Sequence, residues 1–371
     1  MAITDGQRLE IHVFGAAKGE SIVLRLPSGE WGVVDCYSSS LKDSSTNSTL
    51  QFLLDRGVDQ LAFLCMTHPH DDHFRGMSHL LDRFNVHCFW RPSVMTGQRL
   101  KWIIKSARFD AREFGDETAI EDANELDRIF RLVKKKKQAS GKPAMPKSAT
   151  TGTQLFPVPV NRDAEFQVWA LAPSTRQTER YENGLAKCFD ESNRLKTPVA
   201  QSDHNVVSLA LLVVYGNTRI ILGGDVETAG WCDVLEEFGA ENLSSHGVKI
   251  SHHGSTNGYA DGLWQSFAKQ QQPVVFLTSY QRHRLPSKEA LDHIRGFSSR
   301  ILTPCLPAIH AGELPVPLST KAPVESRRVL HKKLKATSAT HFPVGRCSFA
   351  FDNAGNCLEE TFEGEAGAIP V

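Results

Sequence analysis

The chain has 371 residues, enough for one large domain or two ordinary ones with a sizeable buried core. Lysine plus arginine equals aspartate plus glutamate, at 42 each, so the net charge is zero and gives no global argument for nucleic-acid binding. An anionic substrate would therefore have to be held by local charge or by metal ions.

The eight cysteines are scattered without a Cys-x-x-Cys pair, and several lie inside apolar runs. This usage predicts reduced, buried side chains in a cytoplasmic protein rather than a disulfide framework. The N-terminus begins Met-Ala-Ile-Thr-Asp, with no basic segment followed by an apolar one. No stretch approaches the roughly 18 apolar residues of a membrane span, so we expect neither a signal peptide nor a membrane-spanning helix.

The first part of the chain predicts antiparallel strands. Residues 9–14 alternate between apolar and polar, and a turn leads to a second apolar run at 21–26. A third strand at 31–34 ends at Asp35. A carboxylate there could orient a metal-bound histidine or water, or it could cap the following loop, and the local sequence leaves both interpretations open. A Ser/Thr/Asn-rich loop then leads to a short helix at 50–56.

The residues after the apolar run 61–66 carry the strongest chemical signal. The run predicts a buried strand, and after Thr67 the chain reads His-Pro-His-Asp-Asp-His. Imidazoles and carboxylates are common metal ligands, and histidines two apart on an extended segment project to the same side. A lone His-x-His pair is usually surface polarity. Four ligand-type residues in this spacing instead predict that one loop fills two separate metal positions, through His68, His70, Asp72 and His73.

The chain changes character near residue 91. Before that point we expect a helix at 76–84 and a strand at 86–90. The following region, 91–153, is charged, with apolar residues at helical intervals, and it predicts a helical insertion with helices at 101–114 and 119–137.

Loops dominate the middle of the chain. The insertion's second helix ends in four lysines, 134–137, which could contact phosphates but are more simply explained as solvated charges that complement the helix dipole. Residues 138–153 are rich in small residues and predict a mobile loop. A strand is expected at 166–171, and the polar stretch 173–203 predicts a long loop near the active face.

A second chemical block begins at His204. This histidine precedes an apolar strand at 206–215, and a hairpin turn leads to a strand at 219–222 that ends at Asp225. A residue before one strand and a residue after its hairpin partner lie at the same end of a sheet. A solitary histidine is more often an ordinary loop residue, but this placement predicts a third histidine ligand and a bridging carboxylate.

The third block has the same arrangement, a short strand with ligand-type residues at its end. Residues 226–239 predict a helix, and a strand at 248–250 leads into Ser-His-His-Gly-Ser, where Gly254 lets the backbone turn closely. Because adjacent side chains point in different directions, one of His252 and His253 can bind metal while the other faces the substrate.

The tail, 311–371, carries no chemical signal. Pro315 and Pro317 predict an extended connection, residues 326–334 a basic helix, and residues 347–355 part of a closing hairpin.

With these blocks identified, the chain resembles metallo-β-lactamase-fold hydrolases. Within that superfamily it is similar to the ComEC-type group, named for the metallo-hydrolase domain of the bacterial competence DNA-uptake channel. The resemblance spans roughly residues 9 to 303 in the family's order. It is carried by Phe14 to Ser21, Thr67 to His73, Asn205-Val-Val-Ser-Leu with Gly223-Gly-Asp225, and His252-His-Gly-Ser255. The His-x-His-x-Asp-His loop is specific to the superfamily, and the His-His-Gly-Ser block narrows it to the group.

The resemblance implies an α+β four-layer αββα sandwich. The hydrolase domain would span 1–310, with a helical insertion at about 91–153, and 311–371 would be a C-terminal extension packed on the same domain. It also implies two divalent metal ions, with zinc favoured and manganese or iron as alternatives. The implied ligands are His68, His70 and His204 for one ion, Asp72, His73 and His253 (or His252) for the other, and Asp225 as a bridge. Asp35 matches the family's aspartate after an early strand.

The chain departs from the family pattern at several positions. Cys36-Tyr37 stands where a glycine usually follows the aspartate, which would narrow the site. Arg75 replaces a glycine, and His204 fits the superfamily's third histidine, which ComEC relatives often lack. Leu285 occupies a histidine position, where His283 could substitute. No membrane channel accompanies the domain, so a role in DNA import is not transferable.

The function implied is a binuclear-metal-dependent hydrolase, a phosphodiesterase or nuclease using a metal-bridging hydroxide. Asp72, His252 and His283 would act in catalysis. Arg75, Arg282 and Arg284 would hold phosphate, although ordinary surface charge explains them nearly as well. One alternative is a carboxylic ester, lactone or thioester hydrolase on the same fold. Another is a partner-regulated component of a multi-protein bacterial system that makes contacts through the insertion or the C-terminal extension.

Overall fold

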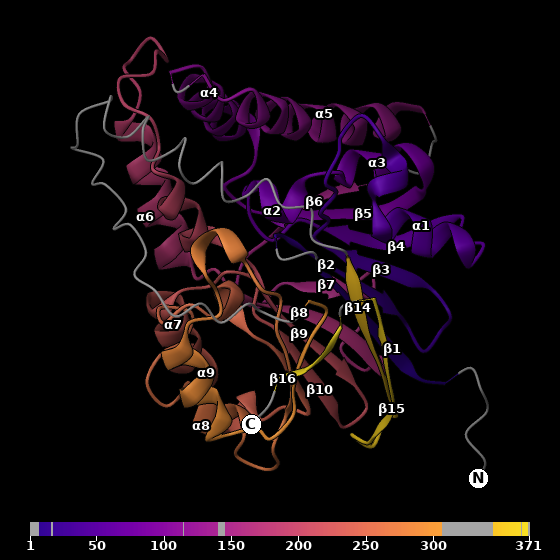
Figure 1. The fold of residues 1–371 in the computed structure, drawn as a ribbon. Helices are drawn as coiled ribbons and strands as arrows, with labels where there is room; N and C mark the ends of the chain where they lie inside the picture. Colours follow the sequence, from indigo (N-terminus) through magenta and orange to yellow (C-terminus); the bar gives the residue numbers. More distant parts are fainter. Residues whose placement is uncertain are drawn as a thin grey trace.

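The computed structural model describes residues 7–15, 18–113, 115–139, 145–305, 344–364 and 366–369. Within these residues, two eight-stranded sheets pack face to face and helices cover both outer faces (Figure 1). This arrangement is a four-layer αββα sandwich, so the predicted fold class is confirmed.

The first sheet has the strand order β15-β14-β1-β2-β3-β4-β5-β6. The three N-terminal strands are antiparallel as predicted, and β3 to β6 run parallel. The hairpin of β14 and β15, also predicted, pairs with β1 and so brings the end of the chain beside its beginning. The strands are β1 (Leu9–Gly15), β2 (Glu20–Arg25), β3 (Trp31–Val34), β4 (Gln60–Cys65), β5 (Asn85–Pro92), β6 (Met145–Ala149), β14 (Gly345–Phe351) and β15 (Cys357–Glu363).

The second sheet has the strand order β16-β13-β12-β11-β10-β9-β8-β7. The predicted hairpin of β9 and β10 is present, and β10 to β13 run parallel. The strands are β7 (Gln154–Phe156), β8 (Phe166–Ala172), β9 (Ala210–Tyr215), β10 (Thr218–Leu222), β11 (Gly247–Lys249), β12 (Val274–Phe276), β13 (Ile301–Thr303) and β16 (Gly367–Ile369).

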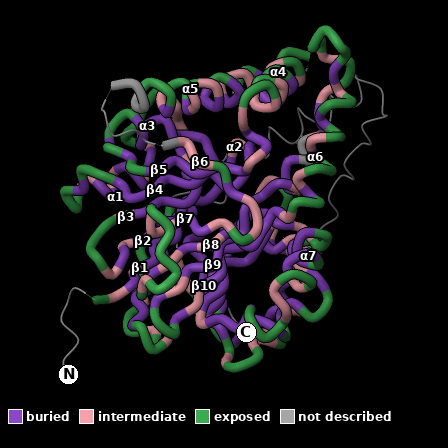
Figure 2. The backbone as a smooth tube through the Cα atoms, turned by 180° about the vertical axis from the view of Figure 1, so that it is seen from behind, coloured by how far each residue is buried: buried purple, intermediate pink, exposed green. Residues whose placement is uncertain are grey.

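Helices form the outer layers. The first sheet is covered by α1 (Ser48–Asp55), α3 (Met77–Arg83), α4 (Gly97–Glu113) and α5 (Glu117–Ala139), with the short α2 (Asp71–Phe74) after β4. The second sheet is covered by α7 (Thr228–Phe238), α8 (Leu263–Phe267) and α9 (Lys288–Arg295), and α6 (Thr175–Lys187) lies between α4 and α7. Figure 2 shows buried strands in the centre and helices with exposed outer faces.

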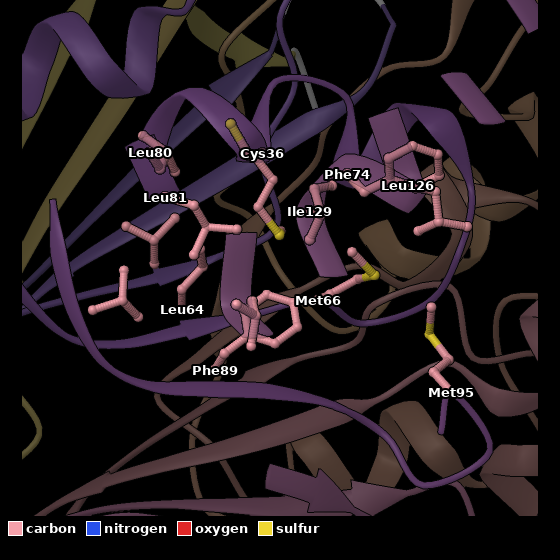
Figure 3. Packing of buried hydrophobic residues seen from close by; sticks show 14 of the residues in the cluster. Cys36, Leu64, Met66, Phe74, Leu80, Leu81, Phe89, Met95, Leu126 and Ile129 are labelled. Carbon is pink, nitrogen blue, oxygen red and sulfur yellow. The ribbon is translucent and has the colours of Figure 1, made fainter. Parts of the chain in front are cut away.

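Alternation along the strands creates three apolar layers. On β2, Ile22 and Leu24 face the interior between the sheets, whereas Val23 packs under the helices of the first sheet. Figure 3 shows the layer between the first sheet and its helices, in which Leu64 and Phe89 lie near side chains of α3 and α5. A third layer fills the space between the second sheet and α7 to α9. Burial of these faces from water is the main force that holds the four layers together.

Two loop predictions were wrong. Residues 145–149, inside the predicted mobile loop, form β6, because an edge position beside β5 tolerates Pro146 and its missing N–H. The predicted loop 173–203 contains α6, which begins at a capping box in which Ser174 and Gln177 satisfy each other's backbone N–H groups. The polar composition of this helix hid the narrow buried stripe of Gln177, Tyr181 and Leu185.

Some tail predictions lie outside the described residues, namely Pro315, Pro317 and the helix at 326–334. Among the described helices, none is long and apolar enough to cross a membrane. The cysteines are all described: five are buried and Cys232 is exposed.

Candidate metal centre

Seven ligand-type side chains lie together where strands of both sheets end. We call them the ligand cluster. Two come from the loop after β4, two from α2, one from a 3-10 turn before β9 (Gln201–Val207), one from the turn after β10, and one from a 3-10 turn after β11 (Ser251–Gly254). In that order they are His68, His70, Asp72, His73, His204, Asp225 and His253.

One half of the cluster surrounds His68. Its Nε2 lies 2.8 Å from His70 Nδ1 and 3.9 Å from Asp225 Oδ2. One ligand atom from each of these three residues lies within 4.8 Å of the others, a spacing that can hold a metal ion. The ring of His204 is the next neighbour, with its centroid 5.5 Å from that of His70.

The other half joins the two sheets. His253 Nε2 lies 3.1 Å from Asp72 Oδ2 and 3.8 Å from Asp225 Oδ2, and His73 Nε2 lies 3.3 Å from Asp225 Oδ1. Glu20, His73, Asp225 and His253 form a second group of ligand atoms within 4.8 Å of one another. Asp225 belongs to both groups, which is the position expected of a bridging carboxylate.

Two atoms at the centre of the cluster are buried without a hydrogen bond. Asp225 Oδ1 and His73 Nε2 have no partner of good geometry among the described residues. An unsatisfied buried polar atom is costly, and a cation between these two atoms would satisfy both. The imidazole and carboxylate donors suit zinc, and also manganese or iron. The residues therefore fit a pair of divalent cations.

The charges of the cluster also favour a bound cation. Burial alone would lower the pKa of His73, but the carboxylates of Asp225, Asp72, Asp35 and Glu20 raise it well above its usual value. Burial would raise the pKa of Asp225, but His73 and His253 hold it well below its usual value. The carboxylates thus favour positive charge beside His73, and a bound cation would supply it while the ligating imidazole stays neutral.

Asp35 lies directly behind His73. The carboxylate is fully buried, and its Oδ2 lies 2.7 Å from His73 Nδ1. It also accepts hydrogen bonds from the backbone N–H and the hydroxyl of Thr67, both at 2.7 Å. The structure thus places Asp35 where it can orient a metal-binding histidine, one of the two interpretations that the sequence left open.

Tyr181 is a contact that the sequence did not predict. Its hydroxyl lies 2.7 Å from His204 Nδ1. Burial and the neighbouring His70 lower the pKa of His204 to about 3, so this ring is neutral at pH 7. The sequence signal that could have pointed to Tyr181 is the capping box of α6. It indicates that the segment predicted as a loop is a helix, which would bury one face.

Glu20 and Lys249 were also missed. They form an ion pair in which both side chains are buried, at 1% and 0% exposure. Each occupies a strand among apolar residues, and a charged residue in that setting is a signal because such residues are rarely buried unless paired.

The adjacent histidines after β11 separate as expected. His253 is 1% exposed and lies inside the cluster, whereas the His252 side chain is 21% exposed. His252 Nε2 lies 3.3 Å from Asn205 Nδ2, and its Nδ1 lies 3.7 Å from Glu227 Oε1. Both histidines have positive φ, at 48° and 51°, and this tight turn sends their rings to different sides.

Tyr37 fills space beside the cluster. A Cβ on Gly19 would lie 2.4 Å from the Tyr37 ring and 2.7 Å from the backbone oxygen of Asp72, and the Gly19 φ is +74°. Only glycine fits there. The tyrosine that stands near the family's glycine position is therefore packed against the loop of the metal ligands.

The predicted phosphate-binding arginines are not equivalent. Arg75 is buried, and its guanidinium is paired with Asp122 on α5, so it holds the helical insertion. Arg282 lies on the 3-10 turn Gln281–His283, and its Nε makes no hydrogen bond among the described residues. Burial would raise the pKa of Asp71 beside the cluster, but Lys18 and, to a smaller extent, Arg282 lower it. Arg284 follows in the left-handed conformation. His283 stacks on Tyr280, which itself stacks on His253, with centroids 4.9 Å and 5.3 Å apart.

No protein-family model matches the sequence, and no curated protein does. Among solved structures, the chain is similar to a point mutant of CmlA beta-hydroxylase, with a TM-score of 0.41 and 13% identity over 79% of this chain and 52% of that one. It therefore spans about half the length of that protein. It is also similar to the metallo-beta-lactamase fold protein YhfI from Bacillus subtilis, with a TM-score of 0.39 and 10% identity over 80% of this chain and 95% of that one. A third is Zn²⁺-bound PqqB from Methylobacterium extorquens, with a TM-score of 0.38 and 10% identity over 76% and 84% of the two chains. All three likenesses are distant, so the roles of individual residues are argued from this chain's own contacts.

Proposed function

We propose that this protein is a binuclear-metal-dependent hydrolase that cleaves phosphodiesters in a nucleic acid or nucleotide. The observation that carries the proposal is the position of Asp225 between two groups of ligand-type side chains, with its Oδ1 buried and without a hydrogen bond among the described residues. One carboxylate shared by two ligand groups is typical of two-metal hydrolytic sites.

The proposed ligands divide between the two halves of the cluster. His68, His70 and His204 would hold one ion, Asp72, His73 and His253 the other, and Asp225 both. When bound, two such ions lower the pKa of a water molecule to about 7 and stabilise negative charge that develops on the substrate oxygens. Asp35 and Tyr181 would fix the orientation of His73 and His204 through the hydrogen bonds at their Nδ1 atoms.

A proton for the leaving group could come from His252. Its partly exposed ring lies at the edge of the cluster, and its buried Nδ1 makes no hydrogen bond among the described residues. Glu227 Oε1 lies 3.7 Å from its Nδ1 and Asn205 Nδ2 lies 3.3 Å from its Nε2, so these two neighbours limit the ring's rotation. His283 offers a second imidazole, which stacks on Tyr280.

Phosphate recognition would fall to Arg282 and Arg284, which lie on either side of His283 in the turn after β12. The Arg282 Nε is unpartnered among the described residues, and a guanidinium can donate two parallel hydrogen bonds to phosphate oxygens. Because the chain has no net charge, such local cations must supply the attraction for a phosphodiester. We leave Arg75 out of this set because Asp122 occupies its guanidinium.

The test is hydrolysis of a chromogenic phosphodiester by protein reconstituted with zinc and, in parallel, with manganese. We expect Asp72→Ala to lower the rate at least ~100-fold, since general two-metal chemistry depends on every ligand. Asp261→Ala, at an exposed carboxylate in the turn before α8, should leave it unchanged. Metal-loaded protein that turns over lactones or thioesters faster than phosphodiesters would refute the substrate class, and protein that binds no metal would refute the proposal as a whole.

A further inference from the structure

An ion pair connects the two sheets directly behind the ligand cluster. Glu20 is the first residue of β2 in the first sheet, and Lys249 is the last residue of β11 in the second. The Lys249 Nζ is paired with Glu20 Oε2 and also lies 3.4 Å from the backbone oxygen of Gly224, the residue before Asp225. One buried ammonium group therefore contacts both the carboxylate of the first sheet and the turn that carries the bridging aspartate.

The Glu20 carboxylate faces the outer edges of two imidazoles. Its Oε1 lies 3.8 Å from His73 Nδ1, and its Oε2 lies 3.9 Å from His253 Nδ1. Thr278 fills the remaining space, since its hydroxyl donates to Glu20 Oε2 at 2.6 Å and lies 3.1 Å from His253 Nδ1.

The opposite edges of the same rings face the proposed metal positions. His73 Nε2 lies near Asp225, and His253 Nε2 lies near Asp72. A cation bound at the Nε2 atoms would have the imidazole rings between itself and Glu20. Glu20 is thus placed behind the ligands, although its oxygens are close enough to be counted with them.

We propose that Glu20 and Lys249 are positioning residues that hold His73 and His253, one from each sheet, at the separation that a metal ion requires. The inference rests on the metal centre of the proposed function. His73 follows a strand of the first sheet, and His253 lies four residues beyond Lys249 in the second, so their spacing depends on how the two sheets meet. The ion pair joins the two sheets at this position, and the Glu20 carboxylate polarises both imidazoles toward the metal positions.

The experiment separates positioning from simple stability. Glu20→Gln and Lys249→Met each leave one buried charge without a partner and should lower the thermal midpoint of the metal-free protein. The double variant Glu20→Gln/Lys249→Met removes both charges and should regain most of that midpoint. We expect its affinity for Zn²⁺ to remain about 10- to 100-fold weaker than that of the parent, the range typical for partners behind metal ligands. The absorption spectrum of its Co²⁺ form should shift as well.

A control pair lies away from the cluster. The Arg128–Asp82 pair joins α5 to α3 at the surface, so Arg128→Met/Asp82→Asn should leave zinc affinity and the Co²⁺ spectrum unchanged. A double Glu20/Lys249 variant with parental zinc affinity and an unchanged spectrum would overturn the inference, because the pair would then be structural only. Parent protein that binds neither metal would overturn both the inference and the proposed function. Parent protein that binds metal but cleaves no phosphodiester would overturn the function alone.

Discussion

Removing the hydroxyl of Tyr181 tests whether His204 is a metal ligand held by a neighbour on α6. In Tyr181→Phe the ring keeps its shape and its buried position, and the change deletes the 2.7 Å contact with His204 Nδ1. When Nε2 binds a metal, Nδ1 carries the ring proton, and this N–H donates a hydrogen bond to the tyrosine oxygen. Without that acceptor, the imidazole is free to rotate and the Nδ1 N–H is left buried and unpaired.

Two effects of different size should follow. The lost hydrogen bond is worth about 1 kcal/mol of unfolding free energy. With an unfolding entropy of about 2.1 cal/mol/K per residue over 371 residues, this lowers the thermal midpoint by only about 1 °C. The misoriented ligand should cost far more in function, with metal affinity falling about 10- to 100-fold, or roughly 1.4 to 2.7 kcal/mol of binding free energy.

Tyr215→Phe is the matched control. The Tyr215 hydroxyl donates a hydrogen bond of 2.8 Å to the backbone oxygen of Gln7, and the side chain is also buried, but it lies on β9 away from the cluster. Both variants should lose similar stability in differential scanning calorimetry. Only Tyr181→Phe should weaken zinc binding in a titration against a competing chelator. Equal and unchanged zinc affinities in the two variants would refute the reasoning that Tyr181 orients a ligand.

The other predictions concern the insertion, the metal and pH. Arg75→Met should lower the unfolding free energy by about 3 to 5 kcal/mol, because Asp122 is left buried without its partner. Calorimetry would measure this loss. A raised KM for phosphodiesters with unchanged stability would instead favour the substrate contact that the sequence predicted for Arg75. Treatment with a chelator should lower the thermal midpoint, and zinc at ~100 times its Kd should restore about 2.7 kcal/mol, or roughly 3 °C; an unchanged midpoint would argue against a resident metal. His12, and then Arg25, hold the pKa of Glu10 down to about 2 from 4.5, so its ion pairs stabilise the fold above pH 4.5 and are lost as the pH falls toward 2. Glu10→Gln should therefore cost about 1 to 2 kcal/mol at pH 7, after allowance for solvent screening, and the gap to the parent should narrow between pH 5 and pH 3 in urea titrations; a gap independent of pH would contradict this.

The sequence alone was sufficient wherever the signal is local. The loop from His68 to His73 follows a buried strand, and the chemistry of its side chains and their spacing can be read without knowing what packs nearby. The same holds for Asp225, because a hairpin fixes which end of the sheet its flanking residues share. Alternation along β1 to β3 and the periodicity of α4 and α5 are likewise local, and these elements were predicted.

Elements whose stability comes from distant neighbours could not be predicted in this way. The strand β6 has no apolar alternation of its own and exists because β5 offers it an edge to pair with. The helix α6 has a mostly polar sequence with few buried residues. The role of Tyr181 could not be predicted, because it depends on a contact with His204, 23 positions later in the chain.

The roles of individual side chains depended on tertiary structure most of all. Which of two adjacent histidines enters the cluster was decided by a turn with positive φ at both and by the contact of His253 with Asp72, 181 residues earlier. Arg75 carries the charge expected of a phosphate ligand, but the fold places Asp122 against it. Glu20 and Lys249 meet only because two sheets pack face to face, and this packing depends on the shape of both apolar faces together, which no local pattern in either strand records.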